Sequence, residues 1–191
     1  MPGTNEALPS PPPELDTEAR LALLRSLRGS GDTMRLRTDG VSMSPMMETG
    51  AIVTIQFAPA SDLCAGDMIL FSREDRLVLH RLLHVREAEG GVAFVEKGDH
   101  QPFAADIPAG CVLARAIEVT TSRGTFNAES AAGRRVTNRL LMLSRAEHVL
   151  YHLKARVLGT RPSKAGRLFM RGSRTVRRWL GAGRDVISND Q

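Results

Sequence analysis

Cysteine and aromatic residues are scarce in this sequence. Its 191 residues include two cysteines, one Trp and one Tyr, and aromatic side chains make up only 4% of the chain. Two cysteines cannot form the disulfide framework of a small secreted protein. Apolar residues still make up 42% of the chain, which is enough for a hydrophobic core. We therefore expect one folded domain with appendages, and neither a disulfide scaffold nor a wholly disordered chain.

Long apolar runs are also absent. No segment approaches the ~20 consecutive apolar residues that cross a bilayer. The first residues, MPGTNEALPSPPPELD, lack the basic start and the apolar stretch of a secretory signal peptide. We therefore expect a cytoplasmic protein, either soluble or peripheral at the membrane. In that setting Cys64 and Cys111 are interpreted as small buried apolar residues, and a bridge between them stays open.

Charge is unevenly distributed along the chain, whose formal net charge is +5. Residues 1–120 contain 11 basic and 17 acidic side chains, a net charge of −6. Residues 121–191 contain 15 basic and 4 acidic side chains, a net charge of +11. An acidic body followed by a basic tail suggests that the tail has a charged partner.

The pattern of residue types divides the chain into four segments. Residues 1–14 are rich in Pro and Ser and are expected to be a disordered leader. A short helix is expected within 15–30, with Asp16 or Thr17 as its N-cap. A β region follows over 33–120, where short alternating or β-branched runs recur about every ten residues, as in an all-β barrel or sandwich. The strands expected there are Met34–Thr38, Ala51–Gln56, Met68–Ser72, Leu77–Val85, Val92–Glu96 and Cys111–Thr120.

The last segment, 125–191, is expected to be a basic helical tail. Apolar residues recur at helical spacing from Val136 to Val157, and a second helix is expected over 165–180. Three interpretations of residues 131–180 stay open. The basic residues form a solvated face of helices packed on the body, contact anionic lipid headgroups, or neutralise nucleic-acid phosphates.

Three local patterns in the β region carry side chains suited to catalysis. Ser42 lies between Gly40 and Pro45 directly after an expected strand, so that a flexible and a rigid residue fix a hydroxyl at an exposed turn. His80 lies on the strand Leu77–Val85, and a neutral imidazole can act as a general base near neutral pH. Lys97-Gly98-Asp99, followed by Asp106, supplies carboxylates that could orient the imidazole.

Along the chain the three patterns follow one another in the order serine, histidine, aspartate. The boxes Gly40-x-Ser42-Met43-x-Pro45, Gly66-Asp67-x-Ile69, His80-Arg81 and Lys97-Gly98-Asp99 resemble those of the superfamily of signal peptidase I and the SOS-repressor peptidases. The resemblance covers roughly residues 34–119. The His-Arg box makes the chain more similar to the Ser-His type of archaea and the endoplasmic reticulum than to the Ser-Lys type of bacteria.

The resemblance implies a mainly β fold and a serine peptidase. It implies that Ser42 is the nucleophile, that His80 is the general base, and that Asp106 or Asp99 orients His80, with Asp106 preferred. It also implies that Met43 packs under the nucleophile, beside Gly40 and Pro45 at the substrate. The implied substrate is a peptide or protein precursor, cleaved after a small residue through an acyl-enzyme. No cofactor or metal is expected.

Two features depart from the family pattern. The family has a membrane anchor that this chain lacks, and many relatives carry an assisting hydroxyl at the position of Gly40. Lys97 is the only lysine before residue 154, and its place beside Gly98-Asp99 makes a Ser–Lys dyad an unfavoured alternative.

The alternative of another class is a non-catalytic peptide-binding module that docks through its basic tail. The pair His148 and His152 shares a helix face, but a zinc site would need a third ligand.

Overall fold

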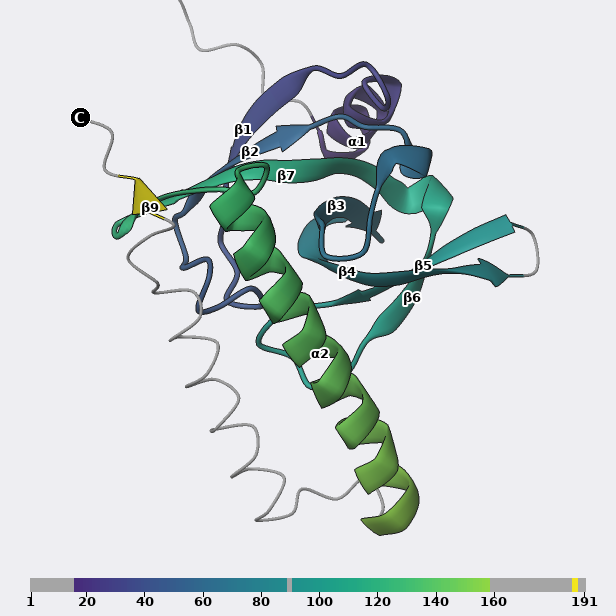
Figure 1. Ribbon diagram of the computed structural model, residues 1–191. Helices are drawn as coiled ribbons and strands as arrows, with labels where there is room; N and C mark the ends of the chain where they lie inside the picture. The colour runs from purple at the N-terminus through teal and green to yellow at the C-terminus, as the bar shows by residue number, and fades with distance from the viewer. Residues whose placement is uncertain (1–15, 89–90, 159–186, 189–191) are drawn as a thin grey trace, which may run out of the picture.

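A computed structural model describes residues 16–88, 91–158 and 187–188 of the chain. Over these ranges the protein is mainly β, an antiparallel sheet curled into a half-barrel with a short helix at its start and a long helix across it (Figure 1). The strands are β1 Thr33–Arg37, β2 Ile52–Gln56, β3 Met68–Arg73, β4 Arg76–Ala88, β5 Gly91–Lys97, β6 Ala105–Pro108, β7 Val112–Thr121, β8 Gly124–Asn127 and β9 Ile187–Ser188. The helices are α1 Thr17–Ser26 and α2 Ala131–Leu158, with single 3₁₀ turns η1 Ala60–Asp62 and η2 Ala109–Cys111.

The sheet has the strand order β1-β2-β7-β3-β4-β5-β6, and β8 and β9 extend it from β7. Each of the six expected strands is present, with ends within three residues of those expected. The short strands β6 and β8 were not expected. Register shifts interrupt the pairs β2–β7, β3–β7 and β4–β5. Such bulges increase local twist and bending, which fits the curled shape of the sheet.

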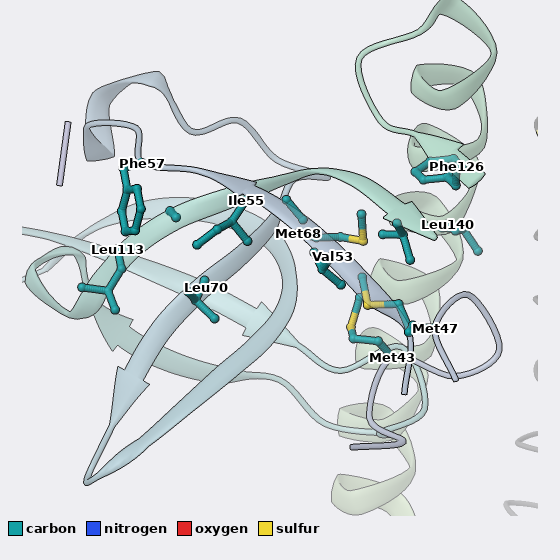
Figure 2. Close-up of a cluster of buried hydrophobic side chains, with 14 of the residues drawn as sticks. Met43, Met47, Val53, Ile55, Phe57, Met68, Leu70, Leu113, Phe126 and Leu140 are labelled. Carbon is teal, nitrogen blue, oxygen red and sulfur yellow. The ribbon is translucent and has the colours of Figure 1, made fainter. Parts of the chain in front are cut away.

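The sheet separates two hydrophobic clusters because successive side chains of a strand point to opposite faces. The larger cluster includes side chains from the turn after β1, from β2, β3 and β7, and from α2. Figure 2 shows Met43, Met47 and Leu140 meeting over Val53 and Met68. The smaller cluster lies on the other face and consists of Ala58, Leu63, Ile69, Phe71, Leu82, Phe94, Ile107 and Val112.

The expected N-terminal helix is confirmed as α1. The Asp16 side chain caps it by accepting a hydrogen bond from the Ala19 N–H at 2.7 Å. Leu21 and Leu24 form its buried face. Gly29 follows the helix with a φ of +76°, a conformation that favours glycine.

The expected helical tail is confirmed for α2 alone. The helix crosses the sheet, and its C-terminal turns extend beyond the strands (Figure 1). The further helix expected over 165–180, with Leu168, Phe169, Val176, Trp179 and Leu180, lies outside the described residues, as does the leader 1–14.

Candidate active site

Ser42 lies in the turn that joins β1 to β2. Its neighbours Met43 and Met47 are buried in the larger core, so two side chains anchor the turn (Figure 2). The Ser42 carbonyl accepts a hydrogen bond from the His100 N–H at 2.7 Å. The turn is therefore held both from the core and from the loop after β5, which fixes the place of a half-buried serine.

His80 points to the face of β4 that carries the smaller core. Its exposed fraction is 3%, and the ring of Phe71 meets it edge-on with centroids 5.9 Å apart. The ring nitrogen Nδ1 lies 2.5 Å from Oε2 of Glu96. A carboxylate at Nδ1 fixes the ring orientation and the tautomer, and leaves Nε2 as the nitrogen that can accept a proton.

Glu96 comes from β5 and is the carboxylate that orients His80. It lies opposite Leu82 in the β4–β5 pair, and therefore on the same face as His80, two residues along the strand. Its second oxygen accepts a hydrogen bond from Nη2 of Arg73 at 2.5 Å. Burial alone raises the pKa of Glu96, but the hydrogen bonds and charges of His80 and Arg73 outweigh burial and lower it below its ordinary value.

Gly98 lies close both to the ring of His80 and to the backbone of Ser42. A Cβ at this position would lie 3.0 Å from Nε2 of His80 and 3.0 Å from the carbonyl oxygen of Ser42. Both atoms thus border the same small space, and Nε2 faces the turn that carries Ser42. Among the described residues no hydrogen bond joins the Ser42 hydroxyl to His80. Catalytic hydrogen bonds are often long before substrate binds.

Asp99, one of the two expected triad acids, forms an ion pair with Arg81. Both side chains are buried, and the guanidinium donates to the carboxylate from Nε at 3.0 Å and from Nη2 at 2.8 Å. Nη1 of Arg81 also donates to the Gly66 carbonyl at 2.9 Å. Bidentate pairing of this kind fixes geometry as well as charge. Asp99 and Arg81 therefore hold the boxes around Gly66 and Gly98 together and keep the loop against β4.

Asp106, the preferred triad acid of the sequence analysis, does not orient His80, and this assignment is corrected to Glu96. Asp106 pairs with Val95 in the register of β5 and β6, whereas Glu96 pairs with Ala105. Adjacent positions point to opposite faces, so Asp106 faces away from the imidazole. It forms an exposed ion pair with Arg86. The strand β6, which the sequence analysis missed, decides this orientation.

Lys97 lies on the opposite face of β5 from Glu96. Its ammonium is fully buried and lies 2.6 Å from Oε2 of Glu147 on α2. The sequence analysis disfavoured a Ser–Lys dyad because Lys97 sits beside Gly98-Asp99, where the triad acid was expected. The side chain points toward α2, where Glu147 accepts a hydrogen bond from its ammonium.

Ser42 is among the residues that line an apolar cleft of about 790 Å³. Its walls come from α1, β1, β2, β3 and β4, and its apolar lining includes Leu21, Leu24, Met34, Leu36, Leu77 and Leu79. Gly40, Ser42 and Met43 also line it, whereas His80 and Pro45 do not. A Cβ on Gly40 would meet no atom within 4 Å, so open space borders the glycine at the cleft.

The remaining expected groups lie away from this site. Cys64 is exposed and Cys111 half-buried, and both are free, so their interpretation as a pair of buried apolar residues is wrong.

His148 and His152 contact each other on α2 with ring centroids 4.5 Å apart. Burial lowers the pKa of His148, and His152 adds to this effect. Within the described ranges no group of three or more His, Cys, Asp or Glu side chains is placed to hold a metal.

Comparison with family models, curated proteins and solved structures found no match to this chain. The family resemblance of the sequence boxes and its functional consequences thus remain proposals. Of the helices that the structure describes, none has the length and apolar character needed to cross a membrane.

Proposed function

We propose that the protein is a serine peptidase with a signal-peptidase-like core. One observation carries the proposal: His80 is tied at Nδ1 to Glu96, while its Nε2 borders the same small space as the backbone of Ser42, a residue that also lines an apolar cleft. A structural histidine would also explain the buried ion pair. It would not explain why the second nitrogen borders the same space as the backbone of a serine that lines a cleft.

The proposed reaction is acyl transfer through Ser42. The hydroxyl oxygen attacks the carbonyl carbon of a peptide bond while His80 Nε2 takes its proton. Glu96, held by Arg73, keeps the imidazole in place and stabilises its protonated form. The tetrahedral oxyanion accepts a hydrogen bond from the Ser42 N–H. His80 returns the proton to the leaving amine, and water then hydrolyses the ester by the same route.

The apolar cleft suits an extended segment of a precursor peptide or protein. The resemblance adds a small residue before the cleaved bond. Charged residues also line the cleft, among them Arg20, Arg37, Asp39, Asp75 and Arg76. An apolar floor with charges around it fits a peptide whose apolar side chains face the protein while its polar groups stay in water.

The test uses candidate precursor peptides and mass spectrometry. The wild-type protein should cleave at least one peptide and should be labelled on Ser42 by a fluorophosphonate. Ser42→Ala and His80→Gln should lose both, whereas the matched variant Ser44→Ala should keep them, because Ser44 is a half-buried serine of the same turn. Cleavage by purified Ser42→Ala protein would end the assignment.

A non-catalytic peptide-binding module is the second candidate. Two observations favour it. Gly40 supplies no hydroxyl to assist an oxyanion. In the part of the chain that the structure describes, the Ser42 hydroxyl forms no hydrogen bond with His80. In this case a peptide bound in the cleft remains intact. Its affinity should then survive the double change Ser42→Ala/His80→Gln, measured by calorimetry, and no fluorophosphonate label should form on the wild type.

A further inference from the structure

The outward face of α2 carries a continuous line of seven residues. Arg135, Arg139, Met142, Ala146, Val149, Leu153 and Arg156 follow one another at alternating spacings of four and three. All seven are exposed, and Met142, Val149 and Leu153 are 65%, 55% and 50% accessible to solvent. Apolar side chains this exposed need an explanation when they form a line and do not occur singly.

The opposite face of the same helix is the one that packs on the sheet. Val136, Leu140, Leu141, Ser144 and Glu147 are buried there. The outward line is therefore not needed for the fold. Its period of 3.5 residues is that of the seam along which two helices pack side by side. The C-terminal turns of α2 extend beyond the strands (Figure 1).

The charges on this face are all positive. Arg135 and Arg139 precede the apolar centre of the line, and Arg156 ends it. Glu147 is the only acidic residue of α2, and it is buried against Lys97. A second copy of α2, parallel or antiparallel, would place arginines against arginines. Residues 159–186 contain eight basic side chains and one acidic one, so they match the charge of this face no better.

We propose that the outward face of α2 binds an acidic amphipathic helix of another protein. The partner's apolar residues cover Met142, Val149 and Leu153, and its carboxylates meet the arginines at the two ends. A membrane surface fits less well, because interfacial helices have a broad apolar face with cations along its sides. Here four exposed apolar side chains form the stripe, namely Met142, Val149, Leu150 and Leu153, and the arginines of the line lie at its two ends.

The test measures binding of the full chain to a designed helical peptide of about 25 residues, long enough to form a stable helix. The peptide carries Leu at the seam and Glu beside it, and its counterpart carries Lys in place of Glu. We expect the wild type to bind the Glu peptide at least about tenfold more tightly than the Lys peptide, as measured by fluorescence anisotropy. Val149→Ser/Leu153→Ser should lose binding to both.

The decisive variant is Arg135→Glu/Arg139→Glu/Arg156→Glu, which should prefer the Lys peptide. The control Arg25→Glu/Arg35→Glu changes exposed arginines away from α2 and should behave as the wild type. Equal binding of both peptides would overturn the proposal. Two other results would overturn it as well. One is binding to phosphatidylserine vesicles, without peptide binding, that Val149→Ser/Leu153→Ser abolishes. The other is a dimer in sedimentation that the same double change abolishes. Cleavage of a short substrate should be unchanged in all these variants, so this proposal and the peptidase assignment can fail separately.

Discussion

At the scale of single residues, the chemistry of His80 depends on which ring nitrogen is occupied. Glu96 occupies Nδ1 at 2.5 Å, and Arg73 holds the second oxygen of Glu96. The pair leaves Nε2 for the serine, as a general base requires. Ser42 and His80 were proposed as nucleophile and base from local sequence, because each stands in its own box. Glu96 was not, because its role depends on strand register and on its face, which a single sequence does not show.

Replacing Glu96 tests whether it orients the base. Glu96→Gln should lower kcat by roughly 10²–10⁴-fold, because an amide can hold the imidazole in the wrong tautomer and cannot stabilise its protonated form. Asp106→Asn is the matched control, since this carboxyl is bound to Arg86 on the other face of the sheet and its loss should leave kcat unchanged. Steady-state kinetics on a cleaved peptide decide between them. The reverse pattern would restore Asp106 to the triad.

The same carboxyl should affect acid stability. The pKa of Glu96 is lowered in the folded protein, despite its burial, by His80 and Arg73. Its ionised form therefore stabilises the fold above its ordinary pKa, and this contribution is lost as the pH falls through the lowered value. Urea unfolding from pH 7 to pH 3 should show a gap between the wild type and Glu96→Gln that narrows on acidification. A gap that stays constant with pH would contradict the linkage.

Gly40 offers a gain-of-function test. Serine at this position would place a hydroxyl in open space at the cleft, and an oxyanion donor is worth roughly 10²–10³ in rate where it acts. Gly40→Ser should therefore raise kcat by about tenfold or more. Gly40→Ala adds the same Cβ without a donor and should not raise it. If the two variants are equally fast, the hydroxyl plays no part in this protein.

At the scale of elements, a strand could be predicted where its own residues form an apolar run or alternate between apolar and polar. The run Met68–Ser72 is nearly all apolar, and Ala51–Gln56 alternates, so both were recognised. The four-residue strands β6 and β8 are too short for a period to show, and they form because neighbouring strands offer free edges. The missed strand β6 is also the reason that Asp106 was assigned to the wrong face.

The contact between β5 and α2 rests on a buried ion pair. Lys97 is fully buried, and Glu147 lies 2.6 Å from its ammonium. Removing one partner of such a pair typically costs about 3–5 kcal/mol, because a charge stays behind in the interior. We expect Glu147→Ala to lose stability of this order in urea unfolding. The exposed pair of Arg86 and Asp106 serves as the comparison, and Asp106→Asn should cost no more than about 1 kcal/mol.

The double variant Lys97→Met/Glu147→Leu separates charge from packing. It removes both charges while keeping apolar volume, and should recover most of the loss caused by Glu147→Ala. If the double variant is as unstable as the single one, the pair acts through its specific geometry and the interpretation as a stranded charge is wrong.

At the scale of the whole molecule, the boundary in charge near residue 120 is not a boundary in packing. Phe126 of β8 and Val136 and Leu140 of α2 belong to the same hydrophobic core as Met43 and Met47 beneath the Ser42 turn. The basic half of the chain thus supports the acidic half that carries the site. Composition showed that the two halves of the chain have opposite net charges. It could not show which basic residues belong to a helix that completes the core.

Leu140 tests this coupling, since it lies on α2 at 2% exposure and packs in the core of the site. Leu140→Ala should cost about 2–5 kcal/mol, because it leaves a cavity where Figure 2 shows the side chain beside Met68. Met142→Ala, two residues along the same helix and 65% exposed, should change stability by less than about 0.5 kcal/mol. In urea, the helical circular dichroism and the peptidase activity should decline together in both variants, as in a single cooperative unit. Activity that persists after the helical signal is lost would mean that the β core and α2 fold separately.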